Sequence, residues 1–295
     1  MTRDDTASEV TIAAVSRALD IPVPTIRSWE RRYGVPAPPR TGGLHRRYSR
    51  TEIDQLRQLR DLITRGFPAR EAAGRVRAGG STDGSRELID GLIASALRLD
   101  TDGIRGALDA AEERFGVEAT LRDVALPSMR EIGARWKAGA CSIEQEHLAT
   151  HVVRTWCGRQ VALMPPPTRP DPIVLSCGPK DQHTIGLEAF GVILGRRGWP
   201  CRVLGAITPT EALLGAVRDL DAAGAVVTAQ RGVTRRAAIE SISAVDAVPG
   251  TRAFYAGDAF SAPSARRGVP GTYLGADVVA AADVLESALD PSRGG

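Results

Sequence analysis

The spacing of hydrophobic positions changes along the chain, and the first part has the spacing of short helices. Residues 11–19 and 24–33 carry apolar side chains at helical intervals, with a break at Asp20–Pro22 between them. A basic, glycine-rich segment at 40–48 predicts a hairpin, and a longer amphipathic helix follows it. Two short helices joined by a tight turn predict a helix-turn-helix, here in a winged form.

The second part of the chain is helical throughout. Apolar stripes that begin near Leu88 and Ile104 predict two helices, and a third runs from about Val117 to Trp136. A fourth helix begins after Ser142, where Gln145 stands at the capping-box position three residues later. Four helices with short connections predict a four-helix bundle.

The third part alternates short apolar runs with helical patterns. This alternation predicts a parallel, doubly wound, flavodoxin-like α/β domain. The runs that predict its strands are 173–177, 202–205, 224–228, 253–256 and 272–274, and the helices between and after them are 184–197, 209–220, 234–245 and 277–289.

Two linkers separate these parts. Residues 78–85 are small and polar, and residues 164–172 are rich in proline. They predict three domains: 1–80 with the winged helix-turn-helix, 81–165 with the bundle, and 166–295 with the Rossmann-like sheet.

Composition and charge narrow the function. Hydrophobic residues make up 43% and charged residues 25%, so the chain is not mainly disordered. The net charge is +3, but residues 1–79 carry 15 Arg against 9 acidic residues, which favours a nucleic-acid-binding N-terminal part. No apolar run predicts a membrane span or a signal peptide, and four scattered cysteines fit a reducing cytoplasm.

The basic residues of the first part form a candidate DNA-binding set. Side chains on the second helix would reach the major groove, and the hairpin would lie along the phosphates as a wing. The alternative is a solvated arginine surface. The set comprises Thr25, Arg27, Ser28, Arg31, Arg32, Arg40, His45, Arg46, Arg47 and Tyr48. Residues 10–76 resemble the MerR family of winged-helix regulators, which carries this Thr-Ile-Arg-x-Trp-Glu-Arg-Arg-Tyr-Gly pattern, and the resemblance implies binding to double-stranded operator DNA.

A candidate ligand site follows the first strand of the third part. Asp181 precedes His183 by two residues, so its carboxylate can orient the imidazole as in metal sites. No Gly-x-Gly-x-x-Gly sequence is present, which counts against a nucleotide. The alternative is a histidine of a surface loop.

Asp181-x-His183-x-x-Gly186 resembles the cobalamin-binding signature Asp-x-His-x-x-Gly. The resemblance implies that His183 is the lower axial ligand of cobalt. The later Ser-x-Leu and Gly-Gly elements of the signature correspond to Thr228-Ala229-Gln230 and Ala256-Gly257, so Thr228 and Gly257 are candidate cofactor contacts.

The bundle contributes Trp136, Glu146 and His147. Two other interpretations exist: Trp136 and His147 as bundle core, and Glu144-x-x-His147 as half of a di-iron site. The second needs another such pair and more carboxylates, and the bundle has no second Glu-x-x-His.

The whole chain resembles the CarH/LitR-type photoreceptor repressors. That resemblance implies that Trp136, Glu146 and His147 enclose the adenosyl group of adenosylcobalamin. It also implies a cytoplasmic, nucleoid-associated repressor that binds operator DNA as a homo-oligomer, a dimer or tetramer, in the dark and releases it after photolysis. The family histidine after the tryptophan is Lys137 here, so a light-independent MerR-type regulator that senses cobalamin, another tetrapyrrole or a protein is the alternative. A corrinoid enzyme is disfavoured because no substrate domain is present.

Overall fold

The structure, a computed structural model, describes residues 10–36, 47–48, 50–64, 66–78 and 83–289. The chain divides into two compact units, Met1–Gly80 and Ser81–Gly295. Within the described residues, no helix is both long and apolar enough to cross a membrane.

The N-terminal unit contains the predicted helix-turn-helix. Helix α1 (Ile12–Leu19) follows Thr11, whose hydroxyl accepts from the Ala14 amide, and ends at Asp20 in the left-handed conformation. Helix α2 (Val23–Tyr33) starts with a proline in its first turn and ends at Gly34, whose φ of 64° favours glycine. The residues at the ends of α1 and α2 therefore determine where each helix begins and ends.

Two further helices and a small sheet complete this unit. Strand β1 (Val10–Thr11) pairs antiparallel with β2 (Arg47–Tyr48), and α3 (Arg50–Thr64) is the predicted longer helix. Helix α4 (Ala69–Ala78) was not predicted, because its buried face consists of small residues, Ala72, Ala73 and Val76, and gives a weak apolar pattern. The predicted wing lies mostly in residues 37–46, outside the described residues.

Residues 83–162 of the second unit are almost entirely helical, as predicted. The helices are α5 (Asp83–Leu97), α6 (Thr101–Ala119), the π-helical segment η1 (Thr120–Ala125), α7 (Leu126–Lys137) and α8 (Ile143–Ala162). Gly116 has φ 78° and ψ 167°, so a break separates the first part of α6 from the segment that leads into α7. The predicted start of the third helix at Val117 coincides with this break, whereas its π-helical turn was not predicted.

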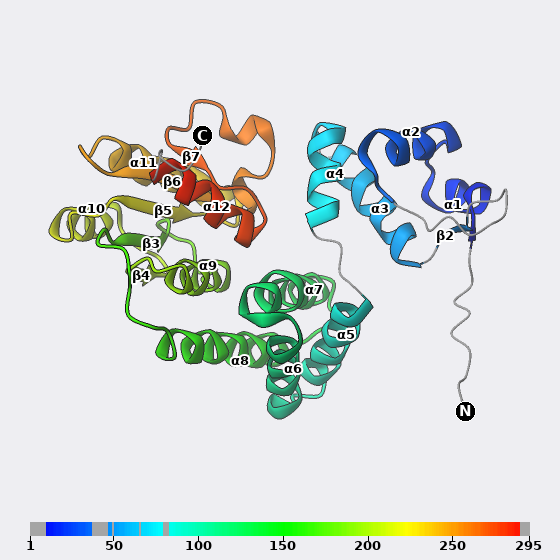
Figure 1. Ribbon diagram of the computed structural model, residues 1–295, viewed down its shortest axis with the longest axis horizontal. Coiled ribbons are helices and arrows are strands. Elements are labelled where there is room, and N and C mark those ends of the chain that lie inside the picture. The colour runs from blue at the N-terminus through cyan, green and yellow to red at the C-terminus, as the bar shows by residue number, and fades with distance from the viewer. Residues whose placement is uncertain (1–9, 37–46, 49, 65, 79–82, 290–295) are drawn as a thin grey trace. The chain divides into compact units, whose positions relative to one another are not determined.

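The rest of the second unit is the predicted parallel sheet. Strands β3 (Ile173–Cys177), β4 (Cys201–Gly205), β5 (Gly224–Thr228), β6 (Arg252–Ala256) and β7 (Thr272–Tyr273) lie in the order β4-β3-β5-β6-β7 (Figure 1). The helices between and after them are α9 (Ile185–Arg196), α10 (Thr210–Asp219), α11 (Arg235–Asp246) and α12 (Val278–Leu289), with short 3-10 turns at 232–234, 258–260 and 263–266. This strand order is the flavodoxin-like one.

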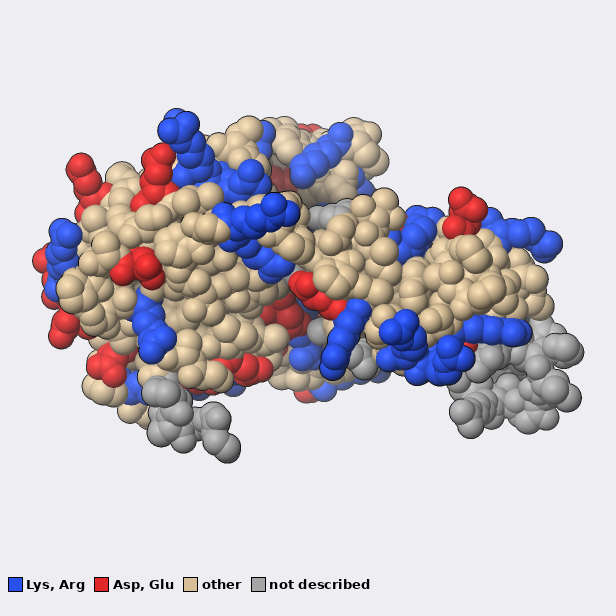
Figure 2. Space-filling view, turned by 90° about the horizontal axis from the view of Figure 1, so that it is seen from above, with Lys and Arg blue, Asp and Glu red and all other residues tan. Residues whose placement is uncertain are grey.

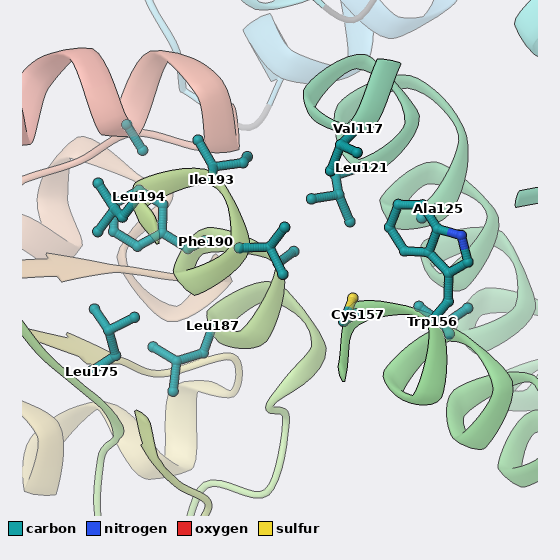
Figure 3. Packing of buried hydrophobic residues seen from close by; sticks show 14 of the residues in the cluster. Val117, Leu121, Ala125, Trp156, Cys157, Leu175, Leu187, Phe190, Ile193 and Leu194 are labelled. Atoms are coloured by element: carbon teal, nitrogen blue, oxygen red, sulfur yellow. The ribbon is translucent and has the colours of Figure 1, made fainter. Parts of the chain in front are cut away.

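The two faces of the sheet belong to different hydrophobic clusters. Ile173 and Leu175 pack into one cluster, and Val174 between them packs into the other, as the period of two in a strand requires. The first cluster also contains Leu121 and Trp156 of the helical region (Figure 3). The helical region and the sheet therefore share one core.

Candidate functional site

The loop after β3 places Asp181 and His183 at the carboxyl edge of the sheet. From β3 the chain passes to β4 on one side and then to β5 on the other, so the strand order reverses at this point. Ligands of doubly wound folds bind at such a reversal, because the loops after the two neighbouring strands diverge there.

Asp181 is the buried centre of this site. It is 1% exposed, and its Oδ1 lies 2.7 Å from Nδ1 of His183 and accepts from the His183 amide at 3.0 Å. Its Oδ2 accepts from the Gln230 amide at 2.6 Å and from the Thr234 hydroxyl at 3.0 Å. Burial by itself would raise the pKa of Asp181, but these hydrogen bonds outweigh it and lower that pKa, with His183 contributing most.

His183 presents the other side of its ring to the outside. Its side chain is 54% exposed, and Nε2 has no hydrogen-bond partner in the part of the chain that the structure describes. Because a carboxylate only accepts, Nδ1 carries the proton and the neutral ring keeps a lone pair on Nε2. The hydrogen bond to Asp181 raises the pKa of His183, against burial and against the positive charges of Arg231 and Lys137.

This arrangement is that of a metal-binding histidine. A ligating imidazole typically donates its second N–H to a carboxylate, which fixes its tautomer and its orientation. His183 and Asp181 therefore fit the lower axial position of a cobalt corrinoid. Among the described residues no three His, Cys, Asp or Glu side chains gather as a metal cluster, so Glu144 and His147 have no set of further ligands there for a di-iron site.

The other candidate residues of the sheet domain are Gly186, Gly257 and Thr228. An added Cβ at Gly186 would meet no atom within 4 Å, so space is open beside the first turn of α9. Gly257 has φ +108°, and a Cβ there would lie 2.1 Å from the carbonyl oxygen of Ala229. Thr228 is buried, with its hydroxyl 3.6 Å from the sulfur of Cys177. Gly257 is thus required by close packing of two loops, whereas a side chain at Gly186 would meet no neighbouring atom.

The predicted residues of the helical region are accessible. Trp136, near the end of α7, is 46% exposed, and the side chain of His147 is 69% exposed. The alternative that these two residues are bundle core is therefore wrong. Glu146 is partly buried and accepts from the Thr150 hydroxyl at 2.8 Å, while His147 lies 3.8 Å from it.

The end of α7 lies close to the sheet site. The charge of Lys137 acts on His183, and the charges of Asp258 and Asp277, in loops after β6 and β7, act on Arg130 of α7. The part of α7 with Arg130 and Lys137 therefore lies near the loops at the carboxyl edge of the sheet.

The N-terminal unit presents arginines on α2. Arg27, Arg31 and Arg32 are exposed, whereas Ile26 and Trp29 of the same helix are buried. Thr25 and Ser28 are partly exposed. Figure 2 shows basic side chains along both the upper and the lower edge of this unit in that view. The apolar face of α2 thus packs inward and leaves its arginine face accessible.

Tyr48 was predicted to contact DNA, and the structure shows that this prediction is wrong. It is completely buried, and its hydroxyl donates to the Glu30 carboxylate, so it packs in the core of the unit. Arg47 belongs to β2, opposite Thr11. Arg40, His45 and Arg46 lie outside the described residues.

Sequence reasoning missed Thr234 and the backbone of Gln230 as partners of Asp181. The Thr234 hydroxyl also lies 2.9 Å from the carbonyl oxygen of Arg231. Neither residue is near Asp181 in the sequence, and a backbone amide leaves no mark on residue type. The only available signal was that both residues follow a predicted strand, as Asp181 does. Loops that follow parallel strands lie at the same edge of a sheet.

Two family models match the chain. Residues 10–78 match the MerR HTH family regulatory protein, and residues 88–159 match a B12 binding domain. The protein therefore combines a MerR-type DNA-binding unit with a cobalamin-binding unit, a class of transcriptional regulator.

The chain belongs to the family of the CarA and CarH repressors. It is 37% identical over 215 residues to the HTH-type transcriptional repressor CarA of Myxococcus xanthus, covering 70% of this chain and 71% of CarA. It is 30% identical over 215 residues to CarH of the same organism, covering 67% of this chain and 71% of CarH. These relatives are regulators, which confirms the prediction of a regulator rather than an enzyme.

A solved structure supports the fold of the second unit. The monomethylamine corrinoid protein of Methanosarcina barkeri aligns with a TM-score of 0.56 at 12% identity, covering 69% of this chain and 99% of that protein. At this identity the likeness shows the fold alone.

Proposed function

We propose that this protein is a cobalamin-dependent transcriptional repressor. The Asp181–His183 pair at the strand-order reversal is the observation that carries the proposal. It offers cobalt a neutral imidazole whose tautomer and orientation are fixed by a buried carboxylate. The arginine face of α2 binds operator DNA, and the protein works as a homo-oligomer, a dimer or tetramer, on the nucleoid in the cytoplasm.

The adenosyl form is the proposed cofactor, and light is the proposed signal. When bound, adenosylcobalamin supplies a light-sensitive cobalt–carbon bond above the corrin ring. Trp136 would pack against the bound cofactor, and Glu146 and His147 would hold the polar part of its adenosyl group. The four helices of the 81–165 region act as the cap over the upper face of the cofactor. Loss of the adenosyl group changes what these residues contact, which is the difference that a two-state switch requires.

One observation favours a second candidate function. Lys137 follows Trp136 and lies close enough to His183 for its charge to act on that ring. Because the family histidine at this position is a lysine here, the position offers no imidazole nitrogen to cobalt. A regulator that senses the presence of cobalamin without light is the alternative.

The test compares wild type with His183→Ala. Wild type mixed with adenosylcobalamin in the dark gives the spectrum of histidine-ligated cofactor, and the variant loses that spectrum and binds at least about tenfold more weakly. Operator DNA shifts measured with each cobalamin form, dark and lit, separate the two candidate functions. An unchanged spectrum and affinity in His183→Ala would refute the ligand assignment.

A further inference from the structure

Gln230 joins three loops at the carboxyl edge of the sheet. Its backbone amide donates to Oδ2 of Asp181 in the loop after β3, and its side-chain Oε1 accepts from the Asp258 amide at 3.1 Å in the loop after β6. Gln230 itself lies in the loop after β5. A single residue therefore contacts the partner of His183 with its backbone and a different loop with its side chain.

The Asp258 amide gains from Gln230 an acceptor that its own short helix does not supply. Asp258 is the first residue of a short 3-10 helix, Asp258–Phe260, and the first amides of a helix have no acceptor within it. Gly257, just before it, has a φ that side-chain-bearing residues rarely adopt. The Gln230 side chain thus caps this helix at the point where the loop needs a glycine conformation.

The carboxamide of Gln230 has a defined orientation. Because Oε1 accepts from an amide N–H, the two N–H groups of Nε2 point away from Asp258. Backbone bonds between Ala229 and the β6 loop, to Ala256 and from Ala259, hold the preceding residue in the same way. Residue 230 is consequently held from the β6 side by its side chain and by its neighbour.

We infer that Gln230 is a positioning residue for the cobalt ligand, through its side-chain bridge to the β6 loop. The bridge holds the backbone of residue 230, whose amide holds Asp181, and Asp181 holds His183. This inference rests on the proposed function, since it concerns the orientation of a cobalt-binding imidazole. The remaining support of Asp181 Oδ2 is the Thr234 hydroxyl.

The experiment uses the full-length protein and three variants. Gln230→Met keeps the length of the side chain and the backbone amide but removes the acceptor. Gln230→Glu keeps an acceptor for the Asp258 amide. Gln182→Met makes the same exchange beside His183, at an exposed residue. Each protein is titrated with adenosylcobalamin in the dark, and the fraction of histidine-ligated cofactor is taken from the spectrum.

The expected result is specific to the acceptor. Gln230→Met lowers the affinity for adenosylcobalamin by up to about tenfold and reduces the histidine-ligated fraction. Tenfold is the lower end of the loss seen when a residue that supports a metal ligand is replaced. Gln230→Glu and Gln182→Met retain the wild-type spectrum. In the cofactor-free protein, hydrogen exchange at the Asp258 amide is faster in Gln230→Met than in Gln230→Glu.

Two outcomes overturn the inference. Wild-type ligation in Gln230→Met would show that the bridge is dispensable, and an equal loss in Gln230→Glu would show that the acceptor is not what matters. Failure of the wild type to bind cobalamin is a different result, because it removes the proposed function itself. The hydrogen-exchange comparison still reports on the bridge if ligation is weak in both Gln230 variants.

Discussion

At the scale of single residues, the site depends on one buried carboxylate. Asp181 is almost completely buried, yet four donors stabilise its charge. They are the amide and Nδ1 of His183, the amide of Gln230 and the hydroxyl of Thr234. A buried carboxylate with this many partners stays ionised and fixes the groups around it. The orientation of His183 follows from that environment.

The raised pKa of His183 predicts a pH dependence of cofactor ligation. Cobalt needs the neutral ring, so a proton on Nε2 competes with it, and the histidine-ligated fraction falls as pH is lowered. Asp181→Asn removes the main cause of the raised pKa, so the midpoint moves to lower pH. Spectra of the bound cofactor across pH measure both midpoints. A midpoint that stays in place or moves upward in Asp181→Asn contradicts this account.

Lys137 predicts a limited photoresponse. Position 137 carries a lysine, so it would offer no imidazole to the illuminated cofactor. His147 and His151, four residues apart on α8, are the histidines that could do so instead. Lys137→His is expected to gain a bis-histidine spectrum in the light. A bis-histidine spectrum in wild type that survives His147→Ala and His151→Ala would contradict the prediction.

At the scale of elements, helix ends and helix faces determine what each helix presents. Helix α2 starts with a proline and ends at Gly34, and its buried face carries Ile26 and Trp29. Those constraints direct Arg27 and Arg31 to solvent, where a DNA phosphate or base edge is reachable. The arginine face is therefore a consequence of how the helix packs.

Replacing Arg27 and Arg31 together by Ala is expected to weaken operator binding by about tenfold or more. If both contact phosphates, the slope of log affinity against log salt falls by about one per arginine, because fewer counterions are released. Binding isotherms at several salt concentrations measure this. Arg236→Ala, at a highly exposed arginine of α11, is the control and leaves affinity unchanged. Unaltered affinity and slope in the double variant would exclude α2 as the DNA-binding helix.

At the scale of the whole molecule, the second unit is held together by a charged cluster as well as by its shared core. Arg197, after α9, contacts Glu118 of the helical region at 3.1 Å, and Asp283 and Glu286 of α12 at 2.6 and 3.2 Å. Trp199 donates to Glu286 at 3.1 Å. The hydrogen bond to Glu118 is the main cause of the raised pKa of Arg197, against burial, with Asp283 adding to it.

Arg197→Ala is expected to lower the free energy of unfolding of the second unit by about 1–3 kcal/mol, because three carboxylates lose their shared cation. The estimate is below that for a fully buried pair, since Asp283 is 65% exposed. Chemical denaturation measures the change. The exposed pair Arg236–Glu240 is the matched control, and Arg236→Ala changes stability by less than about 0.5 kcal/mol. A loss no larger than this control would show that the cluster contributes little.

Hydrophobic periodicity and helix-capping residues, read from the sequence alone, predicted most helices and strands. They also placed Asp181 and His183 at the carboxyl edge of the sheet. The short apolar run at 173–177 predicted a buried strand, and Asp181 and His183 were placed in the loop after it. Local chemistry dictates such features, since a helix end or a buried strand depends on nearby residues. Helix α4 escaped prediction because its buried face is built from small residues.

Only the tertiary structure decided which distant groups meet. It placed Tyr48 in the core beside Glu30, although its basic neighbours had suggested a DNA contact. It also brought the Gln230 amide and the Thr234 hydroxyl to Asp181, about 50 residues away in the chain. The physical reason is that strands β3 and β5 become neighbours only through long-range pairing, and a backbone amide donates whatever its side chain is.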